Sequence, residues 1–251
     1  MMFFIKKDQE PDDPRREFLV KALSMGAFAV TGASGLLLPS VEASIFGNVP
    51  RRVPKGKSIY RMKGNVQVNN QPASQNTFIK SDDHIKTGDA SEVVFVVGKD
   101  AFILHSNSSL KLNGTGLLLR NLRLLTGRLL SVFGRRGRNE ALAAVTSTAT
   151  IGIRGTGVYF ESEPDLSYVC TCYGHTQISA TADLSSSEQI ISQHHDAPRY
   201  IAADGSQGKR IIPAPMKNHT DLELMLIEEL VGRTPPFAVS DSGYSAPRRG
   251  Y

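Results

Sequence analysis

The fold is decided by the stretch from Val145 to Cys172, which reads VTSTATIGIRGTGVYFESEPDLSYVCTC. Its many β-branched and aromatic residues favour an extended backbone. Three glycines, Gly152, Gly155 and Gly157, permit tight turns or a close approach of neighbouring strands. We therefore expect two strands hinged at Arg154-Gly155. The GIRGTG spacing matches neither a dinucleotide fingerprint nor a P-loop, so nucleotide binding is not expected.

On both sides of this stretch, short alternating runs separated by Gly, Asn, Asp and Ser predict a mainly β chain. These runs lie at Asn65–Val68, Glu92–Val97, Ala101–Leu104, Ser109–Leu112, Arg128–Phe133, Gly157–Ser162, Ser167–Cys172 and Gln177–Thr181. Spacing of this kind suits a sandwich, a barrel or a solenoid.

One helix is expected near the C-terminus, over residues 221–231. Thr220 and Glu223 have the spacing of a capping box, leucines follow at helical intervals, and Gly232 ends the run. We assign residues 183–236 to a C-terminal extension that contains this helix. Residues 237–251 are poor in apolar side chains and predict a disordered tail.

The central stretch also resembles a known family. Residues 146–161, TSTATIGIRGTGVYFE, are similar to the most characteristic segment of FecR domains. Earlier blocks of that domain are resembled, in order, by GNVQV (64–68), KTGDASEVVF (86–95), NSSLKL (107–112) and GRLLSVF (127–133). The resemblance implies a FecR-like domain over residues 58–182, with a β-solenoid-like or twisted β-sandwich fold. CTCYG (170–174) resembles a secreted bacterial subgroup of these proteins.

Residues 1–43 predict an export signal. Arg15 and Arg16 precede Phe18 and Leu19, an apolar run follows, and the segment closes on a small residue at a plausible cleavage point. The pattern resembles the twin-arginine signal, whose pathway carries folded proteins. We expect a soluble periplasmic protein after cleavage, with membrane contact only through this segment if it is left uncleaved. Residues 44–57, which hold prolines and cations, predict a linker.

The export signal changes what the family resemblance implies. Only thirteen residues precede Pro14, too few for the anti-sigma segment of the best-known FecR-type proteins. We therefore expect a periplasmic binding protein, an envelope signalling or interaction module whose partner is an envelope protein or a small ligand. The alternative is a redox-active or metal-dependent envelope enzyme. The sequence holds no catalytic motif, so we expect no enzymatic activity.

Composition excludes few partners. With 251 residues, 40% of them apolar, the chain suits one domain with appendages. A net charge of +5 could attract nucleic acid, but aromatic residues make up only 7% and Trp is absent. We expect no nucleic-acid partner.

The residues most capable of chemistry are cysteines and histidines. Cys170 and Cys172 are the only cysteines, and on a strand their spacing of two points both thiols to one face. Thiolates with imidazoles form a ligand set for zinc, copper or iron. We predict a metal site made by these two cysteines with His195 and His219, and with His194 as a substitute.

Two other interpretations of the cysteine pair stay open. An oxidising compartment favours a disulfide, yet Cα atoms two apart on a strand lie near the upper limit of about 7 Å, so a bridge needs a local kink. The thiols could also have no function. If a metal binds, Asp196 could orient a ligating imidazole, and His175 is a less favoured ligand than His195 or His219.

Overall fold

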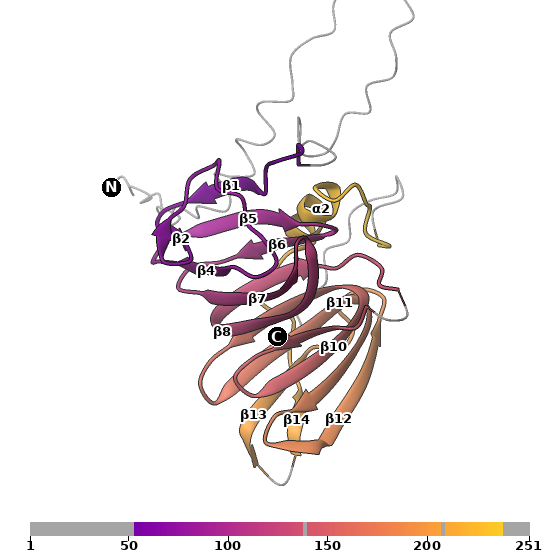
Figure 1. The fold of residues 1–251 in the computed structure, drawn as a ribbon. Coiled ribbons are helices and arrows are strands. Elements are labelled where there is room, and N and C mark those ends of the chain that lie inside the picture. The colour runs from indigo at the N-terminus through magenta and orange to yellow at the C-terminus, as the bar shows by residue number, and fades with distance from the viewer. Residues whose placement is uncertain (1–52, 138–139, 207–208, 238–251) are drawn as a thin grey trace, which may run out of the picture. The chain divides into compact units, whose positions relative to one another are not determined.

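The computed structural model describes residues 53–137, 140–206 and 209–237. In these ranges the protein is mainly β with one helix near the C-terminal end, as predicted (Figure 1). The predicted export signal, most of the linker and the tail after Phe237 lie outside the described residues. No described helix has the length and apolar character that a membrane crossing requires.

The described strands join into one 14-stranded open sheet. Their bounds are β1 (Ile59–Lys63), β2 (Val66–Val68), β3 (Gln71–Pro72), β4 (His84–Thr87), β5 (Glu92–Val97), β6 (Asp100–Leu104), β7 (Ser109–Thr115), β8 (Leu118–Val132), β9 (Leu142–Val145), β10 (Ala149–Ser162), β11 (Leu166–Ala180), β12 (Asp183–Ser192), β13 (Arg199–Ser206) and β14 (Lys209–Pro213). The helix is α2 (Asp221–Glu229).

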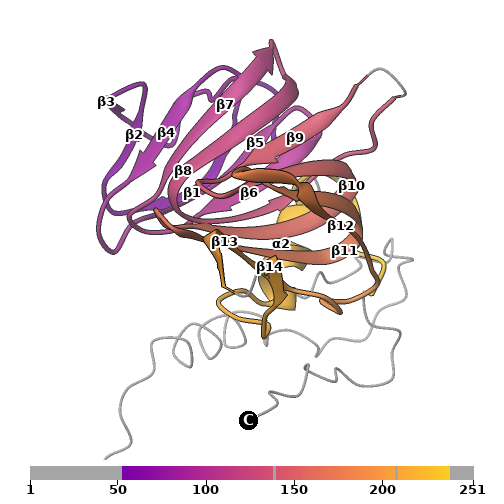
Figure 2. The ribbon, with the colours of Figure 1, turned by 90° about the horizontal axis from the view of Figure 1, so that it is seen from below.

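The three longest strands, β8, β10 and β11, change neighbours halfway along their length. The second half of β8 pairs with β6 and β10, whereas its first half pairs with β7 and β9. In the same way β11 pairs with β13 along its first half and with β12 along its second. The sheet thus folds over itself as two layers that share these strands (Figure 2). The layer containing β5, β6, β13 and β14 is called the helix-side layer, and the layer containing β4, β7, β9 and β12 the far layer.

Each shared strand bends at a glycine with positive φ. These are Gly127 in β8, Gly155 in β10 and Gly174 in β11, with φ of 91°, 58° and 90°. Such angles are accessible to glycine at little cost. The sequence predicted two strands hinged at Arg154-Gly155, but the structure has one strand, β10, with a bulge at this point.

The bulges also explain how both layers face one core. In β10 the inward residues are Ile151 and Ile153 before the bend but Val158 and Phe160 after it. The bulge adds one residue to the strand, which shifts the alternation of inward and outward side chains by one position. Apolar side chains therefore face inward both before and after the bend. Buried apolar residues of both layers therefore form one contiguous cluster.

Strand direction separates the two predicted architectures. Every strand pair of the described sheet is antiparallel except β8–β9. Successive coils of a parallel β-helix stack in parallel, so this pairing is that of a twisted sandwich rather than a solenoid. The β domain predicted from the sequence ends at residue 182, but the sheet continues through β12, β13 and β14.

The outer face of the helix-side layer is covered by the segment after β14. In this segment α2 begins at Thr220, whose side chain forms the predicted capping box with Glu223. The helix ends at Glu229, two residues before the predicted end. It packs on β6 and β8, and the buried Leu224 reaches Gly157 of β10. This segment and this face hold the candidate site.

Candidate metal centre

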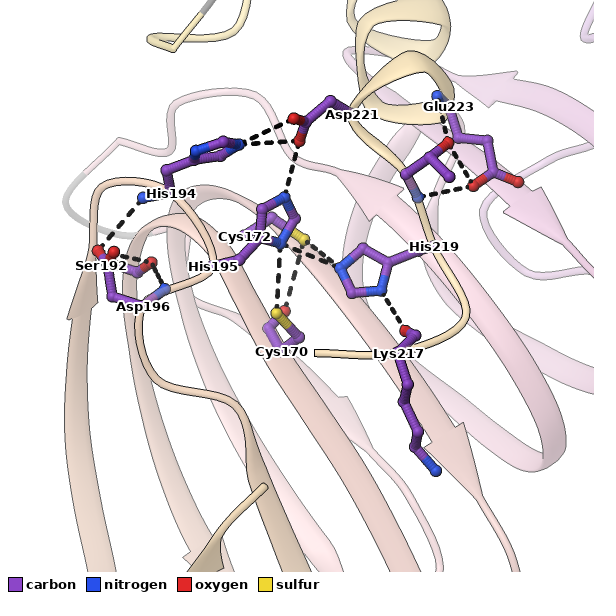
Figure 3. A network of polar contacts seen from close by, with 11 residues as sticks. Cys170, Cys172, Ser192, His194, His195, Asp196, Lys217, His219, Asp221 and Glu223 are labelled. Atoms are coloured by element: carbon purple, nitrogen blue, oxygen red, sulfur yellow. Dashed lines mark hydrogen bonds and ion pairs between the residues drawn. The ribbon is translucent and has the colours of Figure 1, made fainter. Parts of the chain in front are cut away.

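Four side chains from three parts of the chain meet beneath the N-terminal end of α2 (Figure 3). Cys170 and Cys172 project from β11 toward the same point, and neither belongs to the core cluster. His195 comes from the loop between β12 and β13, and His219 from the turn just before α2. These are the four residues that the sequence predicted as ligands.

The ligand atoms of the four side chains converge on one point. Cys170 Sγ lies 3.4 Å from His195 Nδ1, and Cys172 Sγ lies 3.5 Å from His219 Nε2. The two imidazole nitrogens are 3.1 Å apart. All four ligand atoms lie within 4.8 Å of one another.

These separations match the edges of a metal-centred tetrahedron. Zn–N bonds of about 2.05 Å and Zn–S bonds of about 2.3 Å at tetrahedral angles place N and N about 3.3 Å apart, and S and N about 3.6 Å apart. The observed N–N and S–N distances of 3.1, 3.4 and 3.5 Å are close to these values. Small inward or outward shifts would therefore seat an ion of this size.

Hydrogen bonds on the outer side of each imidazole turn its lone pair inward. His195 Nε2 donates to Asp221 Oδ1 at 3.0 Å, and His219 Nδ1 donates to the Lys217 carbonyl oxygen at 2.7 Å. A neutral imidazole carries one N–H, so the nitrogen facing the cluster is left as an acceptor. Ligating histidines in metalloproteins commonly donate their second nitrogen in this way.

The cluster is closed to solvent. Both cysteines are fully buried, and His195 and His219 are 7% and 6% exposed. The ring of Tyr159 stacks on His219 with centroids 4.4 Å apart and covers that side of the cluster. Four ligands without an exposed position are typical of a structural rather than a catalytic metal site.

The pKa values describe the cluster without a metal. The hydrogen bond with Cys172 is the main reason that the pKa of Cys170 lies well below its usual value, while burial raises the pKa of Cys172 well above it. Burial alone would lower the pKa of His195, but its bonds to Asp221 and Cys170 outweigh this and raise it to about 9. Cys172 therefore holds its proton more tightly than Cys170, and a metal ion bound by both sulfur atoms would have to displace the thiol protons.

The loop ligands depend on unusual backbone conformations. His195 itself has φ 56°, and Asn218, which precedes His219, has φ 59°. Left-handed conformations are uncommon for non-glycine residues and concentrate at functional sites. A further bond, from the backbone N–H of His195 to the Cys172 carbonyl oxygen at 2.9 Å, joins the loop to β11.

The other predicted residues lie around the cluster rather than in it. His194 Nε2 lies 2.9 and 3.0 Å from the two carboxylate oxygens of Asp221. It therefore contacts this carboxylate rather than the sulfur and nitrogen atoms of the cluster. Asp196 accepts from the backbone N–H groups of Gln193 and His194 and so shapes the turn. It does not orient an imidazole as the sequence suggested. His175 contacts Gln189 on the neighbouring strand β12.

Sequence reasoning missed the role of Asp221. Its carboxylate bridges His194 and His195, the two neighbouring histidines of the β12–β13 loop. These histidines lie 26 and 27 positions away in sequence, so no local pattern indicates the contact.

Comparisons with known proteins found similarity to solved structures but none at the level of sequence. No family model matches the sequence, and no curated protein matches it. Two crystal structures of a "putative anti-sigma factor" from Parabacteroides distasonis ATCC 8503, at 2.50 and 1.65 Å resolution, are similar with a TM-score of 0.42 and 10% identity. In each case the similarity covers 52% of this chain and 58% of the other, so the chain spans less than two thirds of those proteins.

Proposed function

We propose that this chain is a periplasmic binding protein with a FecR-like domain, that it binds one transition metal ion through Cys170, Cys172, His195 and His219, and that it acts as an interaction module in envelope signalling. The observation that supports metal binding is the convergence of two sulfur and two nitrogen atoms, where the second nitrogen of each imidazole bonds to an oxygen outside the cluster. Two thiolates with two imidazoles suit zinc best, with copper and iron as the alternatives.

The burial of the cluster favours binding over catalysis. A catalytic metal keeps an open coordination position, and a redox-active thiol must be reached by its substrate. Both thiols are fully buried here, which supports a protein whose metal serves structure and interaction.

Metal content is the direct test. The mature chain purified from the periplasm without added metal should contain about one metal ion per chain by elemental analysis. The double variant Cys170→Ser/Cys172→Ser should contain none. His175→Asn is the matched control, because it removes a histidine of β11 outside the cluster. A wild-type chain free of metal that also binds no added zinc would overturn the proposal.

Export and interaction need separate tests. The variant Arg15→Lys/Arg16→Lys should stay in the cytoplasm, since the twin arginines carry the export pattern. Immobilised mature chain should capture an envelope protein or a small ligand from envelope extracts, and the double cysteine variant should capture less of it. Export of the lysine variant, or a mature chain that captures nothing, would count against this part of the function.

A further inference from the structure

The metal ligands come from segments that are held in place to different degrees. Cys170 lies on β11, whose backbone pairs with β10 and β13 on both sides. His219 lies in the segment 214–237, which follows the last strand, β14, and contributes no strand to the sheet. A metal ion bound by all four residues would therefore join this segment to the centre of the sheet.

The segment is also attached by contacts that need no metal. Leu224, Ile227 and Leu230 of the segment are buried, and Asp221 bonds to His194 and His195. The Tyr168 hydroxyl donates to the Pro215 carbonyl oxygen at 3.0 Å, and Glu161 receives both Lys217 at 2.7 Å and Asn218 at 2.7 Å. Lys217 is partly exposed whereas Glu161 is buried, so solvent screens this ion pair only in part. The helix α2 has nine residues, and a helix shorter than about 12 residues is not stable by itself in water. Its persistence depends on docking.

The face beneath the segment is apolar. Ile103 of β6, Leu130 of β8 and Tyr159 of β10 are direct cross-strand neighbours and form a row across the helix-side layer. All three have no exposed surface, although they point away from the core cluster. They owe this burial to the covering segment, since α2 packs on β6 and β8 and His219 stacks on Tyr159.

We infer that the metal ion is a latch: it fastens the segment 214–237 over the row Ile103–Leu130–Tyr159, and loss of the ion releases the segment and uncovers that row. This inference rests on the proposed metal binding and adds what the ion does. Metal occupancy then decides whether the protein presents a covered or an apolar face.

Hydrogen exchange measured by mass spectrometry tests the latch on the mature chain. The zinc-loaded and the chelated protein are compared, with metal content determined in the same samples. Peptides from 214–237 should exchange at least about tenfold faster after chelation, whereas peptides from β7 and β9 in the far layer should not change. Trypsin provides a second readout, because Lys217 and Arg233 lie in the segment and should be cut faster in the chelated protein.

A variant that lacks one metal ligand separates release of the segment 214–237 from unfolding of the sheet. His195→Asn removes one ligand but keeps a residue that tolerates the left-handed backbone of the loop. With zinc added, its segment should exchange like that of the chelated wild type, while protection of β7 and β9 shows that the sheet is folded. Equal exchange of the segment with and without bound zinc would overturn the latch and leave metal binding intact. A protein that binds no zinc would instead overturn the proposed function.

Discussion

On β10, at the centre of the helix-side layer, the two faces are buried to the same extent but by different means. Phe160 and Tyr159 are adjacent on β10, and neither has exposed surface. Phe160 points into the core between the layers, where apolar side chains from many strands surround it. Tyr159 points to the outer face, where it contacts His219 and its hydroxyl donates to Glu161 at 2.8 Å. The sheet alone therefore buries the inner face, whereas the C-terminal segment 214–237 buries the outer face.

The largest effect is expected from Phe160→Ala on the inner face. Truncating a buried Phe costs about 3–5 kcal/mol of folding free energy, because apolar contacts are lost and a cavity is left. The cost should be the same in zinc-loaded and in chelated protein, since the core does not involve the covering segment. Chemical denaturation with and without chelator measures both values. A cost that shrinks after chelation would show that the two faces are not independent.

Leu130→Ala makes the corresponding change on the outer face. In the zinc-loaded protein we expect a loss of about 2–5 kcal/mol, because Leu130 is fully buried under the C-terminal segment. After chelation the loss should be smaller, since the latch would already have uncovered this side chain. The same denaturation series gives the comparison. An unchanged cost in chelated protein would mean that the segment stays docked without metal.

The strands could be predicted from alternation, but their lengths could not. The predicted runs Ser167–Cys172 and Gln177–Thr181 are the two halves of the single strand β11, joined through Gly174. A bulge shifts the inward alternation by one residue, so a long bent strand looks like two short ones in the sequence. For the same reason the sequence indicated β segments without showing that they connect two layers.

The candidate ligands could be predicted because the chain has only two cysteines and six histidines. The structure brings Cys170, Cys172, His195 and His219 together. The choice of Asp196 as the orienting carboxylate was wrong because it relied on nearness in sequence. Asp221 has that position through the approach of α2 to the β12–β13 loop, which is a property of the tertiary fold.

Asp221→Asn should weaken metal binding by about 10- to 100-fold, because the carboxylate both orients His195 and strengthens it as a ligand. Competition with a chromophoric chelator measures the affinity. Asp183→Asn is the matched control: its carboxylate lies at the start of β12, at the end of the hairpin away from the loop that carries His195. An equal loss in both variants would assign the effect to general charge rather than to the contact.

The smallest effect is expected at the helix cap. The Thr220 hydroxyl accepts from the backbone N–H of Glu223, and the Glu223 carboxylate accepts from the backbone N–H of Thr220. Thr220→Ala should cost about 1 kcal/mol, the usual value of an N-cap. If the latch holds the helix, this cost should appear as faster hydrogen exchange in α2 without a change in metal content, because His219 is positioned by the turn before the cap. Loss of metal in Thr220→Ala would mean that metal binding depends on the helix. The latch requires the opposite, that docking of the helix depends on the metal.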